Sequence, residues 1–233
     1  MSKTASISIE SPSEGGKLPK LIPETLEVSR TSILDAAELC FARDGFHRSS
    51  VQNICSAAGI SAGAFYVHFE SKEQLIAGIC ERDRRQFAER FEAFAAAESP
   101  LDALGRLAET YLFEDAQHKR QLFVEIGAEA TRNPEVKALF TSVDRFVEDS
   151  FTTFIEYLIQ TGRASPTVEP RMAAKLILVI GDGLFWRTAV TTDTDIQDEL
   201  SAAMATIGQI LGMDLNSGHL LQNNKAIQRK QAI

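Results

Sequence analysis

Between Arg30 and Lys72 the apolar residues recur at helical spacing, and two glycines divide this stretch into three short helices. Apolar side chains that repeat every three to four positions line one face of a helix. Gly45 is expected to end the first helix and Gly59 the second, because glycine readily adopts the left-handed conformation that closes a helix. The inward positions are Ile33, Leu34, Ala37, Cys40 and Phe41 in the first helix, and Val51, Ile54, Ala57 and Ala58 in the second.

Serine residues mark the beginnings of the second and third helices. Ser49 is expected to open the second helix, with Gln52 three residues later in the position of a capping box. Ser61 is expected to cap a third helix that runs through Phe69. Two brief helices joined by a tight glycine turn are typical of a helix-turn-helix.

The third helix has little side-chain bulk on its outer face. Phe65 and Phe69 lie four positions apart and can enter the core. The small, mostly uncharged face consists of Ser61, Ala62, Gly63, Ala64 and His68, with Tyr66 beside it. Such a helix can approach a DNA major groove closely, so that its first turn meets base edges. Ser71 and Lys72, at the start of the next helix, could then hold a phosphate.

The rest of the chain is helical in pattern, without alternating strand periodicity or an internal repeat. A long helix from Ser71 to Phe94, with Ser71 and Gln74 as a capping box, is expected to connect two domains. Further helices are expected over residues 100–112, 120–132, 134–160, 169–190 and 195–211, with a loop over 161–167. The predicted fold is therefore all-α, with a helix-turn-helix DNA-binding domain over 27–73 and a larger helical domain over 74–212.

The two ends and the cysteines suggest a cytoplasmic protein. Residues 1–26 are rich in Ser, Gly, Pro and Lys and are expected to form a disordered arm, and residues 213–233 a polar tail. The arm contains no hydrophobic signal segment, and no apolar run is long enough to span a membrane. Cys40, Cys55 and Cys80 form no CxxC pair and are interpreted as reduced core residues, with a redox switch as the alternative.

Charge limits how this protein could bind DNA. The 233 residues carry a formal net charge of −8, and 44% of them are hydrophobic. Residues 28–80 contain four basic and five acidic residues, which leaves a net charge of −1. This charge argues against binding by bulk electrostatic attraction. DNA must therefore be bound by a locally arranged basic face.

From Gly45 to Leu75 the chain resembles the DNA-binding domain of the TetR family of bacterial regulators. The pattern G-[YF]-x-x-[TS]-[TS]-x-x-x-I-[AC]-x-x-A-G-[VI]-S-x-G-x-[LF]-Y-x-[HY]-F-x-[ST]-K-x-x-L is matched over this stretch, which is a strong signal because many positions agree in register. The resemblance implies that Gln52, Ala62, Gly63 and Ala64 face bases. It also implies that Ser50, Tyr66, His68 and Lys72 contact the DNA backbone.

The family pattern is weakened at Ala62 and Ala64, where relatives often carry a polar or basic side chain. Alanine offers only apolar contact, for instance to a thymine methyl group. Specificity is therefore expected from Gln52, from Arg48 nearby and from DNA shape. Three residues have simpler alternatives. Tyr66 could be a packing aromatic, His68 could donate to a carbonyl group, and Lys72 could be an ordinary solvated lysine.

The last two helices indicate a homodimer. The segments EIGAEATRNPEVKALF and GDGLFWRTAV resemble parts of the ligand and dimer domain in one branch of the family. The helices carry more apolar surface than one face needs: Leu176, Ile177, Val179, Ile180, Leu184, Phe185, Ala203, Ile207, Ile210 and Leu211. A two-fold dimer built from these helices would bury that surface. Its double-stranded DNA operator should then be a palindrome.

Aromatic residues gather in the larger domain, where they could enclose a small-molecule inducer. The candidate ligand contacts are Phe91, Phe94, Tyr111, His118, Phe123, Phe151, Phe154, Asp182 and Trp186. Aromatic stripes at helical spacing are more often core than ligand site, and that alternative stays open for each phenylalanine. Glu125, Glu129 and Arg132 share one helical face and are interpreted as a surface ion-pair cluster.

These features favour a ligand-responsive transcriptional regulator, most simply a repressor released from DNA by an apolar or aromatic molecule. The alternative is a ligand-independent regulator or architectural protein controlled by a protein partner, with a fully packed second domain. An enzyme is disfavoured, because no catalytic triad, phosphate-binding loop or metal-ligand spacing is present in the sequence. No cofactor and no metal are expected.

Overall fold

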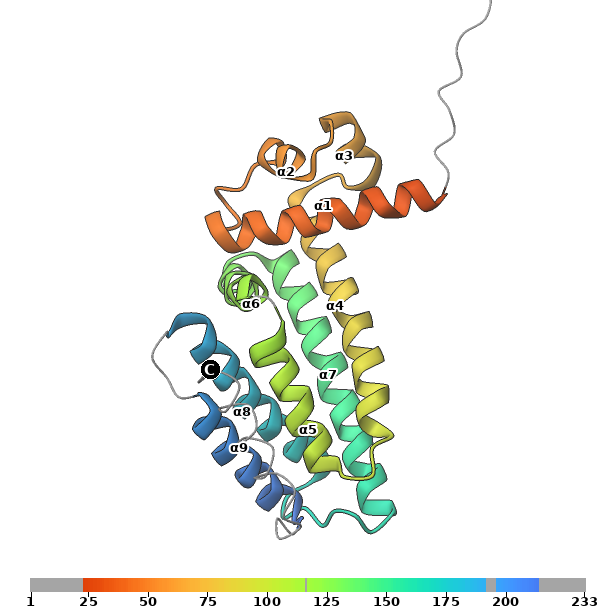
Figure 1. Ribbon diagram of the computed structural model, residues 1–233, viewed down its shortest axis with the longest axis vertical. Helices are drawn as coiled ribbons and strands as arrows, with labels where there is room; N and C mark the ends of the chain where they lie inside the picture. The colour runs from red at the N-terminus through yellow and green to blue at the C-terminus, as the bar shows by residue number, and fades with distance from the viewer. Residues whose placement is uncertain (1–22, 116, 192–195, 214–233) are drawn as a thin grey trace, which may run out of the picture.

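The computed structural model describes residues 23–115, 117–191 and 196–213, and every regular element in these ranges is helical, as predicted (Figure 1). The N-terminal elements are α1 (Pro23–Asp44), α2 (Val51–Ala58), α3 (Ala62–His68) and α4 (Lys72–Ala95). The body continues with α5 (Pro100–Glu109), the π-helix η1 (Thr110–Glu114), α6 (Gln117–Ala130), α7 (Pro134–Gln160), α8 (Pro170–Val190) and α9 (Ile196–Leu211). No helix in the described residues is long and apolar enough to cross a membrane.

Helix α1 lies across one end of the helical body, with α2 and α3 on its far side (Figure 1). It begins at Pro23, so the predicted arm over residues 1–26 is four residues too long. The rest of that arm and the tail from residue 214 lie outside the described residues. Gly45 and Gly59 end α1 and α2 with φ angles of 82° and 68°, in the left-handed region predicted for them.

The predicted start of the second helix is wrong by one residue. Ser50 is its N-cap and accepts a hydrogen bond from the backbone N–H of Asn53. Ser49 is buried instead, and its hydroxyl donates to the carbonyl oxygens of Cys40 (3.0 Å) and Gly45 (2.8 Å). Gln52 therefore takes no part in a capping box and remains on the exposed side of α2.

The N-terminal core does not end at the predicted domain boundary. Its buried residues come from α1 to α4, but Leu122, Ile126 and Ala130 of α6 and Val136 of α7 belong to the same cluster. Helix α1 packs directly on α6. The helix-turn-helix is therefore joined to the larger domain by a continuous core as well as by α4.

The larger domain has a second core formed by α4, α5, α7, α8 and α9. Helices α8 and α9 lie on the side of this body away from α4 (Figure 1). The predicted helix over residues 100–112 is interrupted, because α5 gives way to the π-helix η1 at Thr110. π-Helical turns are rare and frequently lie at functional sites.

Candidate DNA-binding surface and ligand cavity

Helices α2 and α3 present most of the predicted DNA contacts on one exposed surface. Phe65 and Phe69 anchor α3 in the core, as expected. The residues exposed around α2 and α3 are Arg48, Ser50, Gln52, Ser61, Ala62, Gly63 and Tyr66, whereas Ala64, His68 and Lys72 are half-buried. Tyr66 is 59% exposed, which disfavours its alternative role as a packing aromatic. Val67, 62% exposed, shares this surface and was not predicted.

The two serine hydroxyls on this surface are already engaged as helix caps. Ser50 accepts from the N–H of Asn53 at 3.1 Å and donates to the Asn53 side chain at 2.8 Å. Ser61 accepts from the N–H of Ala64 at 3.2 Å. These hydroxyls hold α2 and α3 in shape, and a DNA contact through Ser50 would compete with its bond to Asn53.

Few cations face outward at this end of the molecule. Arg43 forms an ion pair with Asp44, and Arg48 donates from Nε to the Asp44 carbonyl oxygen at 2.9 Å. The ammonium group of Lys72 donates to the Phe46 carbonyl oxygen at 2.7 Å and lies 4.5 Å from the centre of the Phe46 ring. Lys72 therefore ties α4 to the turn after α1, and its contact with the DNA backbone stays a prediction.

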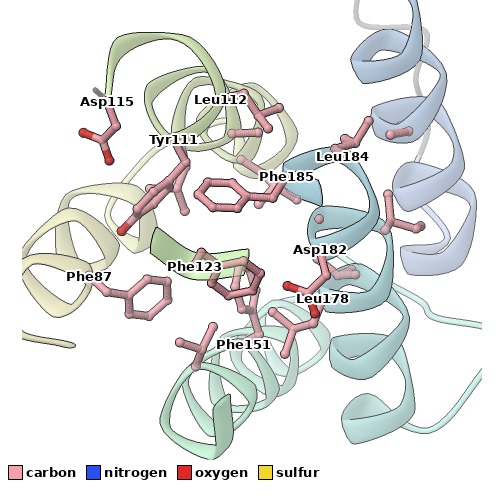
Figure 2. Close-up of a pocket in the computed structure, with 18 of the residues that line it drawn as sticks. Phe87, Tyr111, Leu112, Asp115, Phe123, Phe151, Leu178, Asp182, Leu184 and Phe185 are labelled. Atoms are coloured by element: carbon pink, nitrogen blue, oxygen red, sulfur yellow. The ribbon is translucent and has the colours of Figure 1, made fainter. Parts of the chain in front are cut away.

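A cavity of about 340 Å³ lies within the larger domain. Four of the predicted ligand contacts line it: Tyr111, Phe123, Phe151 and Asp182. Figure 2 shows these side chains around a common space, together with Phe87 and Phe185, which were not predicted. Phe185 lies in the GDGLFWRTAV segment, whose resemblance to the ligand and dimer domain of the family could have pointed to it. Its spacing, however, did not distinguish it from a core residue.

Three predicted phenylalanines do not line the cavity. Phe91, Phe94 and Phe154 pack against one another in the core between α4 and α7, with ring centres of Phe91 and Phe94 4.9 Å apart and those of Phe94 and Phe154 4.6 Å apart. Phe87, one turn earlier on α4, reaches the cavity instead. Their core alternative is therefore correct.

Two polar or amphipathic candidates also lie elsewhere. His118 places Nε2 3.5 Å from a carboxylate oxygen of Glu38, a buried residue that also pairs with Arg82. Trp186 is 52% exposed on the outer side of α8. It belongs to a stripe of exposed apolar residues on that helix, which consists of Met172, Leu176, Val179, Trp186 and Val190.

Some apolar residues predicted for the dimer surface are used within the subunit. Ile177, Ile207 and Leu211 are buried in the core, while Leu184 and Phe185 line the cavity. The outward stripe on α8 repeats at intervals of three, four and seven residues, as one face of a helix does, with Gly183 between Val179 and Trp186. The surplus apolar surface therefore lies mainly on α8.

The cavity wall contains carboxylates whose protonation is disturbed. Burial, followed by the negative charge of Glu38, raises the pKa of Asp83 to about 6. Asp182 is exposed to solvent, yet desolvation, followed by the charge of Asp144, raises its pKa to about 6. Asp115 is held by Arg90 through two hydrogen bonds of 2.9 and 3.0 Å.

Two carboxylates on α6 hold the turn that follows α1. Glu125 accepts a 2.6 Å hydrogen bond from the backbone N–H of Phe46. Glu129 is 1% exposed, accepts a 2.9 Å hydrogen bond from Arg132 Nε, and has a carboxylate oxygen 2.9 Å from His47 Nε2. The predicted ion pair between Glu129 and Arg132 is present, but its placement at the surface is wrong: Glu129 is buried, and both carboxylates contact the turn that leads to the helix-turn-helix. The same helix carries Phe123 to the cavity.

The cysteines do not form a reactive site in the described part of the chain. Cys40 and Cys55 are buried, and burial raises the pKa of both thiols. Burial likewise raises the pKa of Cys80 to about 12. Because the thiolate is the reactive form, these shifts disfavour the redox alternative. No group of three or more metal-ligating side chains occurs among the described residues.

An exposed helix with a small face at one end of an all-helical body, with a separate apolar cavity behind it, defines a helix-turn-helix regulator of transcription. The family model for bacterial regulatory proteins of the tetR family matches residues 33–79. The HTH-type transcriptional regulator UidR of Escherichia coli (strain K12) is 32% identical over 190 residues, which cover 78% of this chain and 93% of UidR. The chain belongs to the TetR family.

Two further relatives agree with this assignment. The HTH-type transcriptional repressor AcnR of Corynebacterium efficiens is 25% identical over 169 residues, covering 72% of this chain and 85% of AcnR. The solved structure of GusR from Salmonella enterica superposes with a TM-score of 0.72 at 28% identity, covering 83% of this chain and 99% of GusR. The similarity therefore extends through both domains.

Proposed function

We propose that this protein is a cytoplasmic repressor that binds a palindromic operator as a homodimer and leaves it when an apolar or aromatic small molecule fills the cavity. The observation that carries the proposal is the position of α6. This helix lines the cavity through Phe123 and holds the turn at Phe46 and His47 through Glu125 and Glu129. A ligand in the cavity can thus change the position of the helix-turn-helix through α6. The proposal assigns the chain no catalytic activity.

In the DNA complex, Gln52, Ala62, Gly63 and Ala64 face the bases in this proposal. Tyr66, His68 and Arg48 contact the backbone, while Ser50 and Ser61 support the two helices as caps. The exposed amide of Gln52 is the one base-facing side chain of this set that can hydrogen-bond a base edge. Lys72 contributes by holding the turn at Phe46, and the phosphate is then met by the N-terminus of α4.

The dimer would form through the exposed apolar stripe on α8. Its residues are solvent-exposed in one subunit, and Val179 at its centre is 67% exposed. A contiguous apolar face of this kind is typical of an interface, and a two-fold dimer covers the same face on both subunits. Dimerisation doubles the few cationic contacts of each subunit, which answers the charge objection raised by the sequence.

The mechanism requires that the ligand bind the released form better than the DNA-bound form. A ligand shifts such an equilibrium only by its differential affinity for the two states. Movement of α6 or α4 on filling the cavity would change the position of the turn at Phe46 and hence the separation of the two recognition helices. The cavity supports this mechanism over the partner-controlled alternative, which calls for a fully packed second domain.

The test is footprinting and fluorescence anisotropy on DNA from the gene's own promoter region. We expect protection of a palindrome, and loss of about 1–3 kcal/mol of binding free energy in Gln52→Ala, the value of a good base contact. Gln160→Ala, at the end of α7 remote from α3, is the matched control and should leave binding unchanged. A chain that protects no palindrome there or beside neighbouring genes would refute the proposal.

A further inference from the structure

The cavity wall is unbalanced in charge. Asp83 on α4 and Asp182 on α8 both line the cavity, and neither forms a hydrogen bond or ion pair with another residue that the structure describes. Asp115 also lines it but is paired with Arg90. The cationic side chain on the wall is Lys119, whose ammonium donates to Gln86 at 3.3 Å.

A second, smaller cavity adjoins the first and strengthens this imbalance. Its volume is about 170 Å³, and it shares Asp83, Lys119, Phe123 and Asp182 with the larger cavity. Asp144 of α7 is added to its wall. Three carboxylates from three different helices therefore surround the junction of the two cavities, against one ammonium group.

Carboxylates placed in this way favour a cationic occupant. Buried charges are normally paired, because removing an ion from water without a partner costs several kcal/mol. Here Asp83 is half-buried, and Asp182, although exposed to solvent, stands at an apolar wall, and the raised pKa values of both groups reflect incomplete solvation. A cation bound between them would supply the missing partner. The same carboxylates would repel an anion.

The rest of the wall suits the body of such a ligand. Phe87, Phe123, Phe151 and Phe185 present rings to the space (Figure 2). Aromatic faces attract cations and also pack against apolar or aromatic groups. In Figure 2 the Asp182 carboxylate projects from α8 toward this group of rings, so the negative charge and the aromatic surface are presented together.

We propose that the inducer of this regulator is an organic cation, with an apolar or aromatic body seated among the phenylalanines and an amine or quaternary ammonium group beside Asp182 and Asp83. This inference rests on the proposed function, since it names the ligand class of the same cavity. Asp182 is the specificity-determining residue. Both Asp83 and Asp182 line the two cavities, but Lys119 and Arg82 act on Asp83, whereas no basic residue is among the charges that act on Asp182.

The experiment compares three compounds that share one body: 4-phenylbutylamine, 4-phenylbutanol and 4-phenylbutyrate. Binding to the full-length protein is measured by titration calorimetry at pH 7.5. The amine is expected to bind about tenfold tighter than the other two, a difference of about 1.4 kcal/mol. Asp182→Asn should remove most of that preference and leave the affinity for the alcohol unchanged. Asp198→Asn, an exposed acid on α9, is the matched control.

The pH dependence gives a second readout. The titratable and charged groups that face the two cavities are Asp83, Cys80, Tyr111, Asp115, Lys119, Asp144 and Asp182, with Arg90 behind Tyr111. Between pH 7.5 and pH 5 the amine stays protonated, while a carboxylate of pKa about 6 falls to about one-tenth ionised. Affinity for the amine should therefore drop by about tenfold over this range in the wild type, and by less in Asp182→Asn.

Equal or tighter binding of the alcohol or the acid, failure of the amine to bind, or an unchanged amine affinity in Asp182→Asn would overturn this inference. The proposed function is judged separately by operator release in the anisotropy assay. Release by the alcohol or the acid at concentrations equal to or below those needed for the amine would leave the ligand-responsive function standing while refuting the cation. Tight binding of the amine without release of the operator would support the cation while refuting the ligand-responsive function.

Discussion

The contact between Glu129 and His47 is expected to couple the stability of α6 to that of the helix-turn-helix. Glu129 lies in the larger domain and His47 in the turn after α1, with the two side chains 2.9 Å apart. A double-mutant cycle of Glu129→Gln and His47→Ala isolates this contact from the bond that Glu129 also accepts from Arg132. The prediction is that the two substitutions are not additive in the free energy of unfolding.

The size of the coupling follows from the exposure of the two partners. The upper bound for a polar contact with a charged group is the value of a well-formed hydrogen bond shielded from water, about 1.5–3 kcal/mol. The His47 side chain is 66% exposed while that of Glu129 is only 2% exposed, so the value must be discounted toward the ~0–1 kcal/mol of a surface pair. We expect a coupling of about 1 kcal/mol. Glu129→Gln alone should then lower Tm by roughly 2–4 °C for each kcal/mol lost, as in chains of this size.

Urea unfolding followed by circular dichroism measures the cycle, and amide hydrogen exchange locates the effect. Exchange should accelerate in α2 and α3 of Glu129→Gln, because the turn that leads into them is no longer held. Glu156→Gln, which removes an exposed carboxylate on α7, is the control and should change neither. Additivity within about 0.3 kcal/mol, or equal destabilisation by the control, would refute the idea that this contact joins the domains.

Three further outcomes are expected. Gly45→Ala should destabilise more than Gly59→Ala in thermal melts: both residues have positive φ, but only at Gly45 would the added Cβ press on a carboxylate oxygen, that of Glu125 at 3.2 Å. Val179→Glu should convert the dimer to a monomer in light scattering and weaken operator binding; a dimer that survives would move the interface away from the α8 stripe. Asp83→Asn should stabilise the protein at pH 7.5 by up to about 3 kcal/mol, since the folded-state pKa of Asp83 is raised from 3.8 to about 6. That pKa makes the wild type lose stability as pH rises from 4 to 6, so the gain should vanish near pH 4, and a gain independent of pH would contradict the reasoning.

The helix-turn-helix could be predicted from sequence because its signals are local. Gly45 and Gly59 take the conformations that their positions suggested, and Ser61 caps α3 as expected. The error at Ser49 arose where two adjacent serines can each begin a helix, and Ala57, predicted to face inward, is exposed. Only the fold decides between them, because the Ser49 hydroxyl is needed to close the buried turn back to Cys40.

The ligand cavity was harder to predict because several aromatic residues share one face of α4. Phe87, Phe91 and Phe94 repeat at helical spacing, and all three pack against α7. Periodicity says that these side chains are inward, but it does not say which of them meets a filled core and which a cavity. That distinction depends on how α5, η1 and α8 close over the other side, which is a property of long-range packing.

The residues of α6 that connect the two domains could not be recognised from the sequence. Glu125 and Glu129, four positions apart, look like the solvated face of a surface helix, and their partners lie 79 residues away at Phe46 and in the same turn at His47. A buried carboxylate such as Glu129 is stable there only because the turn and Arg132 supply its donors. The opposite side of α6 meets the cavity through Phe123. In the proposed function, a ligand that shifts α6 through Phe123 would strain those contacts, and this route from the cavity to the recognition helix is shorter than the one through α4 alone.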